Sequence, residues 1–239
     1  MSIVVPAVLP TSRQDLEEKF SVFTRLPSVS RIQIDVVDER FAPHASWPYT
    51  APEELGEMVA HGMMLPSLDH IEYEIDLMCF DALSAAQAWL TLGASRLTFH
   101  IESAADFPQL LASVRKRYGS GDGFAPGLIS FGLAINIDSN FAHIRPYLEE
   151  ITYVQFMGIA KIGRQGEPFD ERVFKKIETF HNMYPAMTVQ VDGGVSLKNA
   201  KQLLALGVSH FVVGSALSRS SNPAKTFAAF EALQSSYGV

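Results

Sequence analysis

The stretch "VQVDGGVS", residues 189–196, places one carboxylate, Asp192, at the end of an apolar run and follows it with Gly193 and Gly194. A short apolar run bounded by glycine is typical of a buried strand. Two further stretches have the same form, "IQIDVVD" at 32–38 and "FVVGSALS" at 211–218. The pattern predicts buried strands whose carboxyl ends carry acidic residues or glycine.

Strand-like runs recur along the whole chain and alternate with amphipathic stretches. The eight runs lie at residues 3–9, 31–37, 70–78, 95–102, 128–136, 152–158, 188–194 and 209–216. Helical patterns follow them at 12–23, 51–63, 81–94, 107–119, 141–150, 170–183, 196–207 and 222–234. Alternation of this kind predicts a parallel sheet with helical crossovers. Eight units in 239 residues favour a (β/α)₈ TIM barrel, in the α/β class, as one domain over residues 1–239.

The ends of the predicted helices carry their own signals. Ser12 is placed as an N-cap, with Asp15 three residues later in a near capping box. Gly93 and Gly207 follow two helical patterns at the position where glycine commonly stops a helix.

Composition narrows the class of protein. The chain is 47% hydrophobic and 19% charged, which allows an ample core. A net charge of −7 argues against general nucleic-acid binding. Cys79 is the only cysteine, which excludes an intrachain disulfide and a multi-cysteine zinc site. No apolar run reaches the roughly 18 residues of a membrane span, and "MSIVVPAVLP" is unlike a secretion signal. We therefore expect no membrane partner and a cytoplasmic location.

Polar residues in the strand runs point to a site at the carboxyl end of the barrel, where barrel enzymes carry their chemistry. Alternation puts Gln33 on the same face as Asp35, and Asp192 on the same face as Gln190. Burying charge costs several kcal/mol unless the charge is paired or bound to metal. The side chains expected in the interior on these grounds are Asp35, Asp76, His100 and Asp192. A functional role is favoured for Asp35 and Asp192 together. For His100 a purely structural hydrogen-bonded role stays open.

The glycine ends predict a phosphate ligand. Gly193-Gly194 and Gly214-Ser215 directly follow the seventh and eighth strand runs. Loops at this place in a barrel frequently bind phosphate through main-chain N–H groups, which glycine lets a ligand approach closely.

Taken together, the motifs resemble those of the ribulose-phosphate 3-epimerase family through all eight units. "IQIDVVDERFAP" is similar to the family motif H-x-D-V-M-D-G-x-F-V-P, "EIDLM" to D-V-H-L-M, and "LTFHIES" to T-V-H-x-E. "VQFMGIAKIGRQGEPF" resembles M-T-V-x-P-G-F-G-G-Q-x-F, while "VQVDGGV" and "VVGSAL" match E-V-D-G-G-I and V-A-G-S-A-I. Order and spacing together make the resemblance fairly specific.

The resemblance implies a phosphosugar 3-epimerase, an isomerase that interconverts D-ribulose 5-phosphate and D-xylulose 5-phosphate through an enediolate. Asp35 matches the family aspartate that removes the C3 proton, and Asp192 the one that returns a proton to the opposite face. The residues implied as substrate contacts are Gly193, Gly194, Gly214, Ser215, Gly166, Met78 and Met157, with His100 a further candidate. An ordinary core role stays open for both methionines. Family likeness also implies a homo-oligomer.

Departures from the family pattern fall on its metal site. The family holds a metal with two histidines and two aspartates, and Gln33 and Asp76 stand where the histidines would be. One hypothesis is an all-oxygen site of Gln33, Asp35, Asp76 and Asp192, which would prefer Mg²⁺ or Mn²⁺ over Zn²⁺. The other is no metal, with hydrogen bonds carrying the charge of the intermediate. Three carboxylates without a cation would raise one another's pKa, which favours a hard cation.

Three further substitutions keep other functions open. Ala7 replaces a serine that contacts substrate in the family, Val37 replaces a methionine, and Glu39 replaces a glycine. The alternatives are an isomerase or lyase of another phosphosugar, and an inactive barrel that only binds one. Retention of both Asp35 and Asp192 argues against the inactive barrel. The loop at 39–54, with three aromatic residues, is a candidate lid or subunit contact.

Overall fold

The protein, described by a computed structural model at residues 2–26, 28–103, 107–118 and 128–237, forms a closed barrel of eight parallel strands. Neighbouring strands pair in chain order, and β8 returns to pair with β1. The strands are β1 Val4–Val8, β2 Arg31–Val37, β3 Glu72–Met78, β4 Arg96–His100, β5 Ser130–Ile135, β6 Tyr153–Met157, β7 Thr188–Asp192 and β8 His210–Val213. The TIM barrel is confirmed, and each strand lies inside its expected run.

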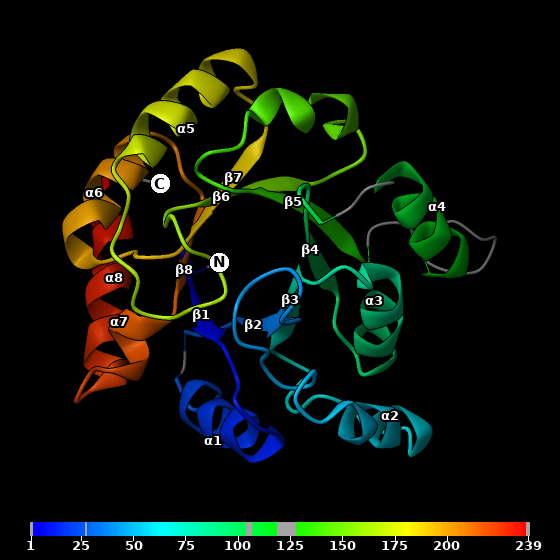
Figure 1. The fold of residues 1–239 in the computed structure, drawn as a ribbon. Helices are drawn as coiled ribbons and strands as arrows, with labels where there is room; N and C mark the ends of the chain where they lie inside the picture. Colours follow the sequence, from blue (N-terminus) through cyan, green and yellow to red (C-terminus); the bar gives the residue numbers. More distant parts are fainter. Residues whose placement is uncertain (1, 27, 104–106, 119–127, 238–239) are drawn as a thin grey trace.

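Helices surround the strands, as Figure 1 shows. They are α1 Arg13–Phe23, α2 Pro52–Ala60, α3 Ala82–Thr91, α4 Phe107–Tyr118, α5 Arg172–Met183, α6 Leu197–Ala205, α7 Ser215–Ser218 and α8 Pro223–Tyr237. The expected end of the fourth helix, at residue 119, lies outside the described residues.

The helix expected at 141–150 is wrong. Two 3₁₀ turns occupy the segment instead, η1 Phe141–His143 and η2 Arg145–Tyr147. Pro146 lies in the middle of the segment. Proline has no N–H, and its ring clashes with the preceding helical turn, so an α-helix cannot run through it without a kink.

The expected helix-end signals are confirmed. The Asp15 N–H donates to Ser12 Oγ at 3.1 Å, so Ser12 caps α1. Gly93 and Gly207 have φ of +101° and +82°, in the left-handed region that glycine adopts without strain.

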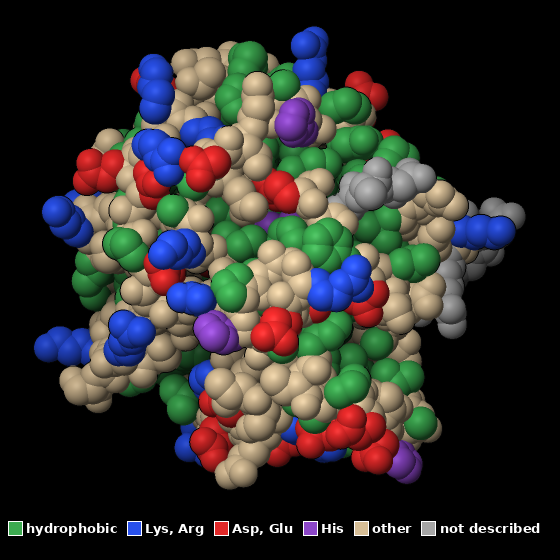
Figure 2. Space-filling view, in the orientation of Figure 1, with side chains coloured by type: hydrophobic (Ala, Val, Ile, Leu, Met, Phe, Trp, Pro, Cys, Tyr) green, Lys and Arg blue, Asp and Glu red, His purple; other side chains and the backbone are tan. Residues whose placement is uncertain are grey.

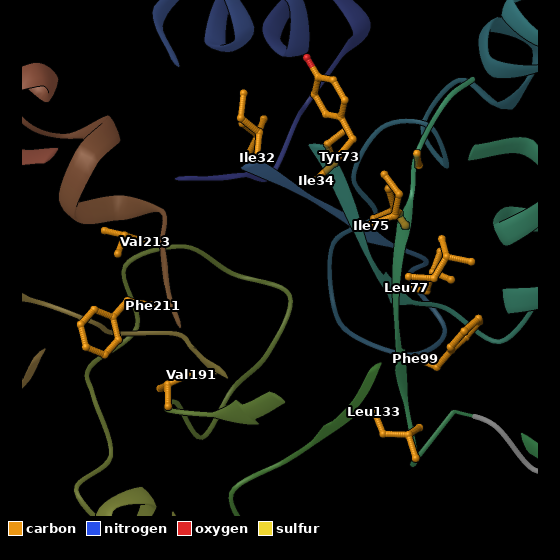
Figure 3. Close-up of a cluster of buried hydrophobic side chains, with 14 of the residues drawn as sticks. Ile32, Ile34, Tyr73, Ile75, Leu77, Phe99, Leu133, Val191, Phe211 and Val213 are labelled. Atoms are coloured by element: carbon orange, nitrogen blue, oxygen red, sulfur yellow. The ribbon is translucent and has the colours of Figure 1, made fainter. Parts of the chain in front are cut away.

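Strand alternation separates an apolar layer from a polar barrel interior. Figure 3 shows the apolar layer, with Ile32 and Ile34 of β2 and Tyr73 of β3 among its side chains. Phe20 of α1 packs on the Tyr73 ring with 5.2 Å between centroids, so this layer faces the helices. The intervening residue Gln33 is equally buried but points into the barrel, where its amide meets other polar side chains. The hydrophobic core therefore lies between sheet and helices, and the interior is left for polar chemistry.

Aromatic residues of the loop at 39–54 are turned into the protein. Trp47 is fully buried, packs edge-on against Trp89 at 5.9 Å between centroids, and donates from Nε1 to Glu54 Oε2 at 2.8 Å. Phe41 packs against the ring of His100 at 5.2 Å. Trp47 therefore anchors the loop in the hydrophobic core, and a role of the loop at 39–54 as a lid or a subunit contact stays a prediction.

The helices and the charged side chains of the described residues agree with what the composition predicts about membranes and charge. None of the helices in the described part of the chain combines the length and apolarity that crossing a membrane requires. On the face drawn in Figure 2, acidic and basic side chains of the described residues are interspersed.

Candidate active site

A pocket opens at the carboxyl ends of the strands and brings most of the predicted site residues together. Asp35 lies near the end of β2 and Asp192 ends β7, and both border this pocket. The other predicted residues in its wall are Met78, Met157, Gly166, Gly193, Gly194, Gly214 and Ser215. Ala7, at the position of the family serine, lines the same pocket.

Three buried aspartates form an acidic group, and two of them, Asp35 and Asp192, line this pocket. Asp35 and Asp76 are paired in register on β2 and β3, and Asp192 reaches them from β7. One oxygen from each carboxylate lies within 4.8 Å of the other two, a spacing that could hold a metal ion. Alternation within each strand and closure of the barrel together produce this arrangement.

The acidic group holds protons near neutral pH. Burial raises the pKa of Asp35 well above its ordinary value, and repulsion from Asp192 and Asp76 adds to the shift. Burial and the charge of Asp76 raise the pKa of Asp192 to about 8. Hydrogen bonds from Gln33 oppose both shifts without cancelling them. The pKa values of Asp35 and Asp192 are therefore shifted toward neutral pH, where general acid–base chemistry is most effective.

His100 lies behind Asp76 instead of at the pocket wall. It is fully buried, and its Nε2 lies 2.9 Å from Asp76 Oδ1. Burial acts to lower the pKa of the imidazole, but the charge and hydrogen bond of Asp76 outweigh it and raise the pKa. His100 therefore balances the charge of Asp76, and the geometry does not bring it to a ligand directly.

Gln33 is oriented as a hydrogen-bond donor within the predicted metal site. Its Nε2 donates to Asp35 Oδ1 at 2.8 Å and to Asp192 Oδ2 at 2.9 Å. Its Oε1 instead accepts from Gln190 Nε2 at 3.3 Å. An amide nitrogen with two hydrogens is a donor and has no lone pair for a metal. Of the predicted set of Gln33, Asp35, Asp76 and Asp192, Gln33 offers no oxygen in this orientation, and the three carboxylates are the groups that could hold a metal ion. The preference for Mg²⁺ or Mn²⁺ stays a prediction.

Glycine is required at the predicted phosphate corner. Gly193 and Gly194 have φ of +98° and +67°, and a Cβ on Gly194 would lie 2.8 Å from Phe169 Cα. A Cβ on Gly214 would lie 2.7 Å from Gln165 Nε2, the end of a side chain that can move aside. Glycine is therefore required at the end of β7 and less strictly at Gly214, and all three glycines line the pocket.

Several residues of this region escaped the sequence reasoning. Gln155 shares a face with Met157 on β6, so the alternation in "VQFM" was an available signal. Arg164 and Gln165 enter the pocket wall from the loop after β6. No local pattern marks these two, because only the folded loop brings them to the corner.

Below the acidic group lies a second buried carboxylate, Glu74. It accepts from Arg96 Nε at 3.0 Å and from Thr98 Oγ1 at 2.9 Å, and Arg31 Nη1 lies 4.0 Å away. Burial acts to raise the pKa of Glu74, but the charges of Arg96 and Arg31 outweigh it and lower the pKa. Glu74 is therefore a permanent anion.

Comparison with known sequences matches the chain to one protein family. The sequence profile of the Ribulose-phosphate 3 epimerase family matches residues 3–218. The chain belongs to the ribulose-phosphate 3-epimerase family. Relatives in it include the ribulose-phosphate 3-epimerase of Schizosaccharomyces pombe, 22% identical over 92% of this chain and 88% of its own. The enzyme of Mycobacterium leprae is 25% identical over 95% and 92%. The family resemblance is confirmed, and the chain is an isomerase of the epimerase class that acts on carbohydrate phosphates.

Solved structures share the barrel. KGPDC from Streptococcus mutans superposes with a TM-score of 0.69 over 99% of both chains at 16% identity, and one of its structures is a complex with a phosphosugar. The 3-hexulose-6-phosphate synthase of Salmonella typhimurium gives a TM-score of 0.67 at 15% identity, over 99% of this chain and 100% of its own. At these identities the likeness shows the fold.

Proposed function

We propose that the protein interconverts D-ribulose 5-phosphate and D-xylulose 5-phosphate by proton transfer at C3. The observation that carries the proposal is the pair of buried carboxylates, Asp35 and Asp192, bordering one pocket with raised pKa values. Inversion of a carbon without net redox needs one group to take a proton and another to give one.

In the forward direction Asp35, as the carboxylate, takes the C3 proton. The electron pair of the broken C–H bond forms the C2–C3 double bond, and the C2 carbonyl oxygen becomes the enediolate oxygen. Asp192, as the acid, then gives its proton to the opposite face of C3 and is left ionised. The reverse reaction uses the same two groups in exchanged roles, so no co-reactant is consumed.

The glycine corner supports a phosphate at the other end of the substrate. Main-chain N–H groups at Gly193, Gly194, Gly214 and Ser215, with Gly166 beside them, would bind the 5-phosphate. Met78 and Met157 are apolar walls of the same pocket and would flank the planar intermediate.

An NMR assay in D₂O tests the proposal. With D-ribulose 5-phosphate the wild-type protein should incorporate deuterium at C3 and form D-xylulose 5-phosphate. Formation of D-xylulose 5-phosphate should vanish in both Asp35→Asn and Asp192→Asn. Deuterium incorporation at C3 should vanish in Asp35→Asn, because that variant lacks the base. A folded wild-type protein that exchanges no C3 proton would contradict the function.

A second candidate, an isomerase or lyase of another phosphosugar, is favoured by one observation. Ala7 in the pocket wall removes the hydroxyl that the family places against its substrate. The same NMR assay with a series of ketose phosphates distinguishes the candidates, because a different preferred substrate or cleavage of a C–C bond would appear directly in the spectra.

A further inference from the structure

Three glutamines and one glutamate inside the barrel have side-chain orientations that depend on one another. Glu74 is the fixed end of the chain of hydrogen bonds, because an ionised carboxylate can only accept. Its two oxygens face Arg96, Thr98 and the Nε2 of Gln190, the last at 2.6 Å.

Glu74 fixes the orientation of the Gln190 amide, and Gln190 in turn contacts two further glutamines. Its Nε2 also lies 2.7 Å from Gln155 Oε1 and 3.3 Å from Gln33 Oε1. An amide nitrogen carries two hydrogens and its oxygen carries none. Turning the Gln190 amide over would set its oxygen against three other oxygens, so Glu74 determines which way Gln190 points.

Gln33 and Gln155 are oriented in turn. With their oxygens held toward Gln190, both present Nε2 to the acidic group. Gln33 donates to Asp35 and Asp192, and Gln155 donates to Asp76 Oδ2 at 3.0 Å and to Asp192 Oδ2 at 3.3 Å. Reversing either amide would place N–H against the N–H of Gln190 and oxygen against carboxylate, which loses hydrogen bonds at both ends.

We propose that Glu74 and Gln190 are positioning residues that hold the Gln33 and Gln155 amides as N–H donors to the acidic group, and that these donors take the place of a divalent cation. The inference rests on the proposed function, since it concerns how the same carboxylates are balanced during proton transfer. A metal ion needs oxygen lone pairs directed at its centre, and here the positive ends of N–H dipoles occupy the approach. Preorganised donors of this kind stabilise developing negative charge without a metal.

Metal titration is the first test. Mn²⁺ added to the wild-type protein in a calorimeter should give no binding in the micromolar range. C3 proton exchange should be unchanged after chelation and dialysis. Micromolar Mn²⁺ binding that also stimulates exchange would overturn the inference.

Substitution of Gln190 is the second test, because its donors can be reversed with little change of shape. Gln190→Glu would share one proton with Glu74, because two adjacent buried carboxyl groups do not both ionise. No hydrogen then remains for the oxygens of Gln33 and Gln155, and these oxygens should turn toward the acidic group. We expect kcat to fall at least about 100-fold with little change in KM, as when one preorganised donor is removed. Mn²⁺ affinity should rise by at least about tenfold, a typical size for effects of residues behind metal ligands.

Gln190→Lys, which only donates, should keep the wild-type orientation and most of kcat. Gln190→Met, of similar volume, neither donates nor accepts, and should lose kcat without gaining Mn²⁺ affinity. Circular dichroism reports folding of each variant. A purely structural role would lower kcat in parallel with stability and leave Mn²⁺ binding unchanged, and that result overturns the proposal. If a charged variant does not fold, Gln190→Met decides, and wild-type kcat in it overturns the proposal.

Failure of the inference and failure of the function look different. A wild-type protein that exchanges C3 protons and requires Mn²⁺ keeps its function and loses the inference. A wild-type protein that exchanges no C3 proton loses its proposed function, while the Mn²⁺ titrations of wild type and Gln190→Glu still decide how the amides point.

Discussion

Buried carboxyl groups occupy two levels of the same barrel, and their pKa values are shifted from the ordinary value in opposite directions. At the lower level Glu74 is fully buried, yet Arg96 and Arg31 lower its pKa. At the upper level burial raises the pKa of Asp35 well above normal and that of Asp192 to about 8, and the charges of neighbouring carboxylates add to burial instead of opposing it. Similar burial therefore gives a permanent anion in one layer and an exchangeable proton in the other.

The difference shows that the partners of a buried acid, more than its depth, decide what it does. Glu74 is matched by cations and serves as an orienting anchor for the glutamines above it. The acidic group is matched mainly by amide donors, which moderate its repulsion and leave protons free to move.

The largest expected effect is the loss of kcat when an aspartate of the upper level is replaced. Asp35→Asn and Asp192→Asn should each lower kcat by about 10³-fold or more, since each removes one partner in general acid–base catalysis. Affinity for the phosphosugar should stay within a few-fold, because the glycine corner is untouched. Steady-state kinetics and calorimetric binding check both values. Asp69→Asn, at a side chain that is 83% exposed, is the control and should be silent.

Removing the charge of Glu74 in the lower level should destabilise the folded protein. Glu74→Gln leaves Arg96 and Arg31 without their buried partner, and we expect a loss of about 3–5 kcal/mol in the free energy of unfolding. Urea denaturation measures it. Glu17→Gln is the matched control, because its pair with Arg13 is exposed and should contribute less than about 1 kcal/mol. Equal losses in the two variants would contradict the contrast.

Stability should depend on pH with opposite sign in the two layers. Folded Asp192 keeps its proton up to pH about 8, whereas the unfolded chain releases it near 3.8. The contribution of protonated Asp192 to the free energy of unfolding is complete below the pKa of the unfolded chain. This contribution falls by about 1.4 kcal/mol per pH unit as pH rises toward 8. Glu74, with a lowered pKa, stabilises above its ordinary 4.5 and loses that contribution as pH falls. Urea denaturation from pH 5 to 8 should show Asp192→Asn gaining on wild type as pH rises. A difference that does not change with pH would disprove the shift.

The smallest effect is expected at the phosphate corner. Arg164 is exposed in the pocket wall and would contribute a screened charge to phosphate binding. Arg164→Ala should raise KM about fivefold and leave kcat unchanged, the size of a surface ion pair. The effect should shrink as salt rises. Arg13→Ala, at a residue that does not line the pocket, is the control, and a fall in kcat with Arg164→Ala would contradict a role in binding alone.

The sequence by itself determined the barrel and the positions of Asp35 and Asp192, because strand alternation and glycine ends are local patterns. A strand repeats every two residues, so alternation in "IQIDVVD" already placed Asp35 inside, and "VDGG" already marked the end of a buried strand. The same local reasoning failed at 141–150, where Pro146 blocks a helix whose apolar spacing is otherwise suitable.

Only the tertiary structure decided how the glutamines act. Gln33 is the same residue whether it offers oxygen or N–H, and its choice depends on Gln190, which lies 157 positions away in the chain. Gln190 in turn depends on Glu74, 116 positions away. These contacts exist only after the barrel closes and brings the interiors of distant strands together. Local patterns identify which side chains face inward, but hydrogen-bond direction is set between neighbours in space, and that distinguishes a metal ligand from the donor that stands in its place.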